Sequence, residues 1–215
     1  EFPEQFFGGL WFTVQISIFG LIGSLVLGTV IALCRVSPVA VLRWLGGAYV
    51  EFFRNTPLVV QLFFLFLGLP LTGFRFATDT FDNIFRAAVA GMALYHAAYV
   101  AEIVRGGLLG VDKGQIEAAR TLGLSYAQML RYVQLPQTFR SVIPPLGNIA
   151  IALVKNTSLA STIGVAELLF AAEFVETRTF RAEEAFLTST MLYLLLTIPM
   201  GVVVNALERR MLIER

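Results

Sequence analysis

The sequence predicts an all-α integral membrane protein with about five membrane-spanning helices in a single domain, residues 1–215. Hydrophobic residues make up 57% of the chain and charged residues only 14%, whereas soluble domains contain roughly 45–50% and about 25%. The charges are also distributed so that long uncharged stretches remain, which is typical of helices that cross a bilayer. Disorder, a coiled coil and a nucleic-acid-binding domain fit this composition poorly, and the net charge of +1 provides no basic surface for a polyanion.

Three stretches carry no charged residue and are long enough to span a membrane, namely 6–34 (29 residues), 55–74 (20) and 185–207 (23). A spanning helix needs about 20 mostly apolar residues. Two shorter runs, 87–101 (15 residues) and 141–154 (14), reach that length only if the helices extend past their flanking charges or are bent. A soluble bundle with long core helices is the alternative, but most helices of such a bundle have a polar face and these runs have none.

The distribution of basic residues predicts the orientation of the chain. If five spans alternate sides, the 16 Lys and Arg residues divide as 11 on one side and 5 on the other. The more basic side is expected to be the cytoplasm, which places the N-terminus outside and the C-terminus inside. The first run is too long for a signal peptide and is preceded by Glu1 and Glu4 rather than by a basic segment. The chain lacks an initiator Met, so we expect residues upstream of Glu1.

The single cysteine, Cys34, and the single histidine, His96, limit the chemistry of the chain. They exclude a disulfide framework and metal sites that need several cysteines or two histidines. We expect Cys34 to be inert at the inner interface, and His96 to be packed or close to a pore rather than a metal ligand.

The second and fourth spans are predicted to be broken. Thr56 is a good N-cap and Pro57 suits a first helical position, so the second span is expected to restart at 55–57. The fourth contains Pro144 and Pro145 near its start and is expected to be interrupted at 155–158. Broken helices are tolerated in a bilayer where they line a cavity, and transporters place substrate sites at such breaks.

Residues 112–136 form the longest polar segment and predict a helix, a tight turn and a second helix on the cytoplasmic side. Asp112 and Ser125 can each cap a helix, and each is followed three residues later by a glutamine. Gly123 suits the left-handed residue that ends the first helix, and Pro136 is expected to stop the second from continuing straight into the membrane. An ordinary amphipathic pair of interfacial helices would show the same composition.

Residues 117–136 read EAARTLGLSYAQMLRYVQLP, which resembles E-A-A-x3-G-x9-I-x-L-P, the cytoplasmic-loop signature of ATP-binding-cassette (ABC) importer permeases. Val133 stands where isoleucine is usual. Three further segments resemble the polar amino acid branch, the histidine/glutamine/glutamate permeases: EFFRNTPLVVQLFF (51–64), YVAEIVRGG (99–107) and LVKNTSLASTIG (153–164). The resemblance covers almost the whole chain. The residues that match the loop signature are Glu117, Ala118, Ala119, Gly123, Leu135 and Pro136.

This resemblance implies a MetI-like (type I ABC importer) permease subunit in the bacterial cytoplasmic (inner) membrane. It implies that two such subunits, identical or paralogous, pair around a pathway, and that two cytoplasmic ATPase subunits dock on the signature residues. An extracytoplasmic binding protein would deliver a polar amino acid. No nucleic acid partner is implied.

The residues themselves fit a chain that does not hydrolyse ATP. The phosphate-binding pattern G-x-x-x-x-G-K-[ST] is absent, and the nearest glycine cluster, 106–114, lacks a lysine followed by Ser or Thr. We therefore expect no cofactor on this chain and expect ATP and Mg²⁺ to be used by a partner ATPase. Closure of that ATPase would draw two docking helices together and open the pathway outward, and hydrolysis would return it to the inward-facing state.

Glu102 and Lys155 are the candidates for the substrate pathway, because ionisable residues at membrane depth are costly. Free N–H groups of a helix restarted after Thr56 could bind a carboxylate. Alternatively, Glu102 pairs with Arg105 three residues on, Lys155 extends to the outer interface, and 156–158 only caps a helix. Neighbours expected to form hydrogen bonds are Asn55, Thr56, Gln61, Asn156, Thr157 and Ser158.

Three other functions remain as alternatives. An autonomous secondary carrier or channel would transport alone and would need no docking helix, so the 117–136 signature speaks against it. An intramembrane serine protease using His96 would need a serine in a tight glycine-flanked turn, and no G-x-S-G pattern is present. The third alternative is a scaffold protein without transport activity.

Overall fold

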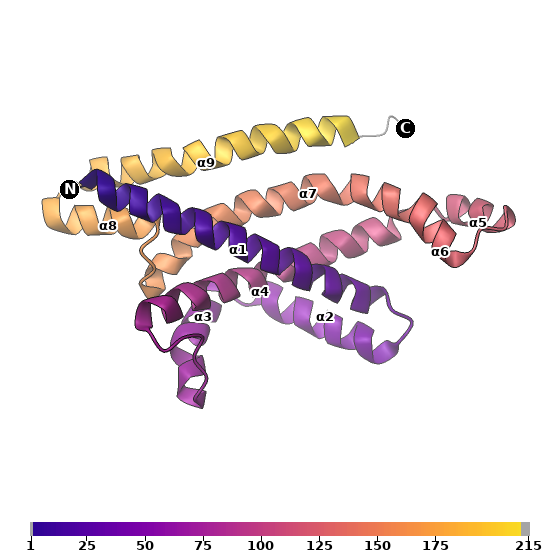
Figure 1. Cartoon of the computed structure of the whole chain (residues 1–215), viewed down its shortest axis with the longest axis horizontal. Coiled ribbons are helices and arrows are strands. Elements are labelled where there is room, and N and C mark those ends of the chain that lie inside the picture. Colours follow the sequence, from indigo (N-terminus) through magenta and orange to yellow (C-terminus); the bar gives the residue numbers. More distant parts are fainter. Residues whose placement is uncertain (1, 212–215) are drawn as a thin grey trace.

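The computed structural model describes residues 2–211, and every regular element in this range is helical. The N- and C-termini lie at opposite ends of the elongated molecule (Figure 1). The turn between α1 and α2, the α5–α6 loop and the C-terminus share one end, while α8 lies at the other. The elements are α1 (Phe2–Val36), α2 (Ala40–Asn55), α3 (Leu58–Phe63), η1 (Phe64–Gly68), η2 (Leu69–Thr72), α4 (Thr80–Leu109), α5 (Lys113–Thr121), α6 (Tyr126–Met129), η3 (Leu130–Gln134), α7 (Leu135–Asn156), η4 (Thr157–Ile163), α8 (Leu168–Thr179) and α9 (Ala182–Met211).

Three helices are each long and apolar enough to cross a membrane: α1 with 35 residues, and α4 and α9 with 30 each. Two further spans arise if each bent pair of helices counts as one. The first pair, α2 with the segment from α3 to η2, is bent by 105°, and the second, the helix ending at Ile163 with α8, by 48°. The described chain therefore has three to five spans, in agreement with the predicted five.

Small residues of α1 bring it into close contact with α4 along most of its length. A β-carbon added at Gly28 would lie 2.6 Å from the Cβ of Val100, and one at Gly23 would lie 2.8 Å from the Cβ of Ala93. In lipid, helices associate mainly through such close packing, since the solvent itself is apolar. The seam places α4 in the centre, where it also contacts α2 and α7.

Two other crossings fix α7 between α4 and α9. A β-carbon at Gly107 of α4 would lie 2.3 Å from Cγ1 of Val142, and one at Gly147 of α7 would lie 2.4 Å from Cγ2 of Val204 in α9. Thus α7 contacts α4 near its start and α9 near its middle.

The second span breaks where the sequence predicted, but Thr56 does not cap the new helix. Thr56 is the extended residue that ends α2, with φ −112° and ψ 139°, and Pro57 rather than Thr56 precedes α3. The hydroxyl of Thr56 donates to Phe52 O at 2.9 Å. The helix breaks at Thr56 because the residue before a proline is forced out of the helical region. The new helix has only six residues before it changes to a π turn and a 3₁₀ turn.

The fourth span differs from the prediction at Pro136. Pro136 does not end the preceding helix, because the π turn η3 and α7 continue it, and Pro136 takes an early position of α7 where a missing N–H costs little. The interruption expected at 155–158 is a change of helix type, since α7 ends at Asn156 and passes directly into the 3₁₀ helix η4. The turn occurs at Gly164, whose φ of +89° suits a residue without a side chain.

We expect Gly28→Ala to destabilise the protein by about 1–3 kcal/mol, because the new methyl group overpacks the seam between α1 and α4. The measurement is the midpoint of thermal unfolding in detergent. Gly8→Ala is the matched control on the same helix, since nothing lies within 4 Å of a β-carbon at Gly8. Equal midpoints for the two variants would contradict the importance of this seam.

Candidate functional site

The loop between α4 and α7 is held in shape by its own capping residues. The carboxylate of Asp112 accepts from Gly114 N at 2.6 Å and from Gln115 N at 3.3 Å, which fixes the start of α5. Leu124 N donates to Ala119 O at 3.1 Å where Gly123, at φ +76°, ends that helix. The predicted helix, left-handed glycine and second helix are therefore confirmed.

The start of α6 has the reciprocal capping box that the spacing predicted. Ser125 N donates to Gln128 Oε1 at 2.9 Å, and Gln128 N donates to Ser125 Oγ at 3.4 Å. Such caps stabilise short helices that have little packing of their own. The loop can therefore present α5 as a preformed helix.

The signature residues divide between an exposed surface and an anchor. Glu117, Ala118 and Gly123 are exposed, as is Pro136 at the start of α7. Ala119 is buried, and Leu135 is half-buried. Because Ala119 faces inward, α5 is attached by that side and offers its acidic and small residues outward.

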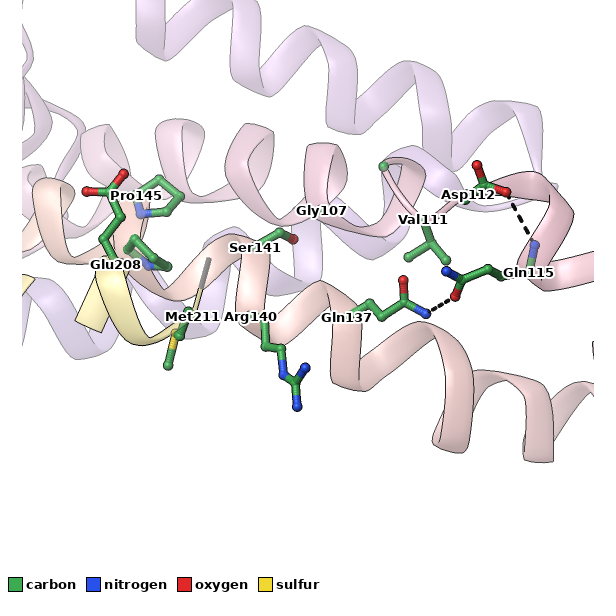
Figure 2. Close-up of a pocket in the computed structure, with 12 residues that line it drawn as sticks. Gly107, Val111, Asp112, Gln115, Gln137, Arg140, Ser141, Pro145, Glu208 and Met211 are labelled. Carbon is green, nitrogen blue, oxygen red and sulfur yellow. Dashed lines mark hydrogen bonds between the residues drawn. The ribbon is translucent and has the colours of Figure 1, made fainter. Parts of the chain in front are cut away.

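A cavity of about 680 Å³ lies where α5, α7 and the end of α9 meet. Its polar lining includes Asp112, Gln115, Gln137, Arg140 and Glu208. Figure 2 shows that the amide groups of Gln115 and Gln137 point toward each other, while the side chain of Arg140 points away from them. The start of α5 thus lies beside an open space, while Ala119 further along the helix is buried.

A second group of polar residues surrounds the bend between α2 and α3. Gln61 Nε2 donates to Thr56 Oγ1 at 2.7 Å and to Phe53 O at 3.1 Å, which ties the new helix back to the end of α2. Asn55 Nδ2 donates to Glu51 Oε2 at 2.9 Å. Within the described chain, Gln61 Oε1 is buried and has no hydrogen-bond partner, so it remains an available acceptor.

A continuous line of contacts runs from this bend through α4 to the end of α7. The guanidinium of Arg54 lies 5.5 Å from the ring centroid of Tyr99, and the hydroxyls of Tyr99 and Tyr95 are 3.0 Å apart. The ring of Tyr95 contacts the ring of His96 edge-on at 5.2 Å. His96 Nε2 lies 3.2 Å from Asn156 Nδ2. The line joins three helices that are distant in the sequence.

The tautomer of His96 follows from its partners. Nδ1 lies 2.9 Å from Met92 O, which can only accept, so Nδ1 carries the hydrogen. Nε2 of the neutral ring is then the acceptor, and the amide of Asn156 donates to it. His96 is 2% exposed, so it serves as a packed link between α4 and α7, as the sequence predicted for a packed histidine.

Glu51, Arg54 and Lys155 are exposed on the isolated subunit although they lie far along their helices. Glu51 follows the start of α2 by about 16 Å, at 1.5 Å per residue, in a hydrocarbon layer of about 30 Å. A charged side chain that faced lipid at such a depth would cost about 2.5–3.5 kcal/mol. This face therefore borders water or another subunit. The sequence analysis did not name Glu51 and Arg54, although both lie in the segment 51–64.

Comparison with known proteins decides the family. Residues 24–213 match the family model described as binding-protein-dependent transport system inner membrane component. The chain belongs to this family. The permease is 38% identical over 208 residues to the probable glutamine ABC transporter permease protein GlnM of Bacillus subtilis (strain 168), a match that covers 97% of the permease and 94% of GlnM.

Two solved structures confirm the MetI-like fold. One is titled as the crystal structure of an amino acid ABC transporter with histidines; it has a TM-score of 0.89 and 33% identity, and the match covers 97% of the permease and 94% of that chain. The other, titled as an inward-facing conformation of the MetNI methionine ABC transporter, has a TM-score of 0.71 and 19% identity, with 98% and 96% covered. The resemblance to ABC importer permeases is confirmed, and these matches favour a permease subunit over an autonomous carrier. The permease works with an ATPase and is not the ATPase itself.

Glu102 lies three residues after Tyr99 on α4, next to the polar line. Its carboxylate forms ion pairs with Arg35 of α1 and, at 2.9 Å, with Arg105 on its own helix. The alternative of an ion pair with Arg105 is thus what the structure contains, with Arg35 as an additional partner. Thr157 is fully buried and donates to Val154 O at 2.8 Å.

Glu167 is a buried residue that the sequence analysis did not single out as a site. It is 0% exposed, and among residues 2–211 it has no ion pair. Its carboxylate accepts from Phe170 N at 2.9 Å, as the cap of α8, and from the hydroxyl of Tyr193 at 2.5 Å. Close by, Thr13 accepts from Leu168 N at 3.2 Å. The cluster joins α1, α8 and α9, and only a tertiary structure could reveal it.

We expect Asn156→Leu to destabilise the permease by about 1–3 kcal/mol, because Nε2 of the buried His96 then loses its donor. The measurement is again thermal unfolding in detergent. Asn148→Leu is the matched control, since Asn148 is an exposed residue of the same helix with no hydrogen bond among the described residues. Equal losses in the two variants would show that the His96 contact is not special.

Proposed function

We propose that this permease forms half of a membrane pathway for a polar amino acid and is driven by ATPase subunits that dock on α5 and the turn at Gly123. The carrying observation is the preformed, outward-facing helix α5. Its caps at Asp112 and Gly123 fix its two ends, and Ala119 anchors its inner side. The substrate class is supported by GlnM and by the amino acid transporter to which the chain is similar.

The docking surface consists of the signature residues of the loop 112–136. Glu117 can accept hydrogen bonds or pair with a basic residue of the ATPase, and Ala118 permits a close approach. Ala119 anchors the helix from below. Gly123 sets the direction of the chain after α5, and Leu135 with Pro136 begins the helix that carries the movement into the membrane.

The amino acid pathway follows the polar line described above. Arg54 supplies a cation for the α-carboxylate, and Glu51 supplies a carboxylate for the α-ammonium group. The unpaired Gln61 Oε1 is a further acceptor for that ammonium group. Lys155 and Asn156 border the same line from α7. Glu102, three residues after Tyr99 on α4, is paired with Arg35 and Arg105 beside the same line. The remaining hydrogen-bonding neighbours that we assign to this region are Asn55, Thr56, Thr157 and Ser158.

The assembly proposed around this chain has two permease subunits, identical or paralogous, with two ATPase subunits that use ATP and Mg²⁺. The permease itself holds no nucleotide or other cofactor. A binding protein outside the inner membrane delivers the amino acid. The N-terminus faces outward and the C-terminus inward, which is supported by the positions of the termini at opposite ends of the molecule and by the basic residues near α5.

In the proposed cycle, ATP binding closes the ATPase dimer and draws the two α5 helices together. The membrane helices rock as rigid bodies, and the pathway opens outward to accept the amino acid from the binding protein. Hydrolysis separates the ATPases and returns the pathway to the inward-facing state. The chain contributes docking, positioning and electrostatic contacts.

We expect Gly123→Asp to leave membrane insertion intact but to abolish substrate-stimulated ATP hydrolysis. The change combines backbone strain at φ +76° with a new charge on the docking surface. Gly123→Asn, which tolerates this conformation and adds no charge, is expected to retain coupling. Normal coupling in Gly123→Asp would remove the docking assignment, and uphill uptake by the permease without any ATPase would favour the autonomous carrier.

We expect Arg54→Gln to reduce uptake about tenfold or more, because a charge-assisted contact to the substrate carboxylate is lost. The measurement is the initial rate of uptake of labelled glutamine, glutamate or histidine into proteoliposomes that contain the complete transporter and its binding protein. Arg54→Lys keeps the charge and is expected to retain most of the rate. Uptake by Arg54→Gln at nearly the wild-type rate would exclude Arg54 from the pathway.

A further inference from the structure

A single side-chain hydrogen bond joins α5 to the long helix α7. Gln137 Nε2 donates to Gln115 Oε1 at 2.5 Å, although the two residues are 22 positions apart in the chain (Figure 2). Within the part of the chain that the structure describes, no other hydrogen bond connects these two helices. Gln115 is itself held in place, since its backbone N–H is bonded to the cap Asp112.

The start of α7 is attached to α4 much more firmly. Thr138 Oγ1 donates to Gly107 O at 3.3 Å, and Gln134 Nε2 donates to Leu108 O at 3.0 Å. Gly107 also lies in close contact with Val142. These contacts fix α7 and α4 to each other, whereas α5 reaches α7 through one bond.

The other route from α5 to α7 passes along the chain through α6 and η3. That route contains the π turn Leu130–Gln134, directly followed by Pro136, whose nitrogen has no hydrogen. A π turn and a proline interrupt the regular hydrogen bonding that makes a helix stiff. Beside it lies the cavity of about 680 Å³, which Gln115 of α5 and Gln137 of α7 both line. Packing at this point is therefore poorly suited to passing on a displacement.

We propose that the Gln115–Gln137 hydrogen bond transmits the displacement of α5 directly to α7, past the π turn. This inference rests on the proposed docking of an ATPase on α5. Gln137 is a positioning residue, since it acts on the pathway through α7. The helix α7 continues from Leu135 to Asn156 and contains Pro144 and Pro145. Gln137 lies before both prolines and next to Thr138, so a shift at Gln137 acts on the part of α7 that contacts Gly107 of α4.

Loss of this bond has a specific consequence. The ATPase still docks on α5 and still moves it, but the displacement is absorbed at the π turn. ATP hydrolysis then continues while less amino acid is moved for each ATP. A residue that merely stabilised the fold would lower both activities together through the amount of intact transporter.

The test is the number of labelled glutamine molecules imported per ATP hydrolysed by the complete transporter with its binding protein in proteoliposomes. Gln137→Met keeps the length of the side chain but removes the donor, and we expect the ratio to fall about fivefold, the factor that corresponds to one neutral hydrogen bond. Gln137→Lys retains a donor and is expected to restore the ratio. Arg140→Gln, one turn further along α7 with its side chain pointing away from the pair, is the matched control and is expected to leave it unchanged.

The double variant Gln115→Met with Gln137→Met tests whether the two glutamines act through their mutual hydrogen bond or have independent roles. If the two amides act only through their mutual bond, the double variant has the same ratio as either single variant. A ratio in Gln137→Met that equals wild type, or losses that multiply in the double variant, would overturn the inference.

A cross-linking arm distinguishes failure of this inference from failure of the docking proposal. In a Cys34→Ala background, Ala118→Cys on α5 is reacted with the ATPase by a short bifunctional thiol reagent. Cross-linking that persists in Gln137→Met together with a lowered ratio supports transmission through the Gln115–Gln137 bond. Cross-linking with an unchanged ratio overturns that transmission alone. Absence of cross-linking in the otherwise wild-type chain overturns both the transmission and the docking of the ATPase on α5.

Discussion

The close contact of α1 with α4 is the constraint on which the rest of the permease depends. Lipid provides no hydrophobic force between helices, so association relies on how closely two backbones can approach. Gly23 and Gly28 allow that approach because a β-carbon at either would overlap α4. With one side of α4 covered in this way, its other sides receive α2 and α7. The central helix can then carry polar residues that a lipid-facing helix could not.

The polar line through α4 shows how this arrangement serves transport. Tyr95 and His96 are adjacent on one central helix and Tyr99 lies one turn further, and they meet Arg54 from one neighbour and Asn156 from another. A movement of the end of α7 relative to α4 therefore changes the His96–Asn156 end of the line before the Arg54 end. The loop on which the ATPase is proposed to dock precedes α7, and Lys155 and Asn156 lie at the far end of α7, whereas Arg54 and Glu51 belong to α2.

The sequence predicted the features that depend on local chemistry. Uncharged runs located the spans, Asp112 and Ser125 capped the helices as their spacing indicated, and Gly123 has the expected left-handed conformation. Pro136 was misjudged because a π turn can accommodate a proline that would otherwise end a helix. The polar residues 155–158 mark the end of the α-helix at Asn156, but the turn at Gly164 that follows the 3₁₀ helix was not predicted. Contacts between distant segments, such as Arg54 with Tyr99, leave no local pattern and could not be predicted.

The buried carboxylate of Glu167 constrains the order in which the membrane protein is assembled. Its phenolic partner Tyr193 and the hydroxyl of Ser189, which donates to Leu168 O at 3.1 Å, both belong to α9, which is synthesised after α8. Only Thr13, from the first helix, is available earlier. The segment α8 therefore lacks these side-chain partners until α9 has been synthesised, so the buried carboxylate acquires its full set of contacts late.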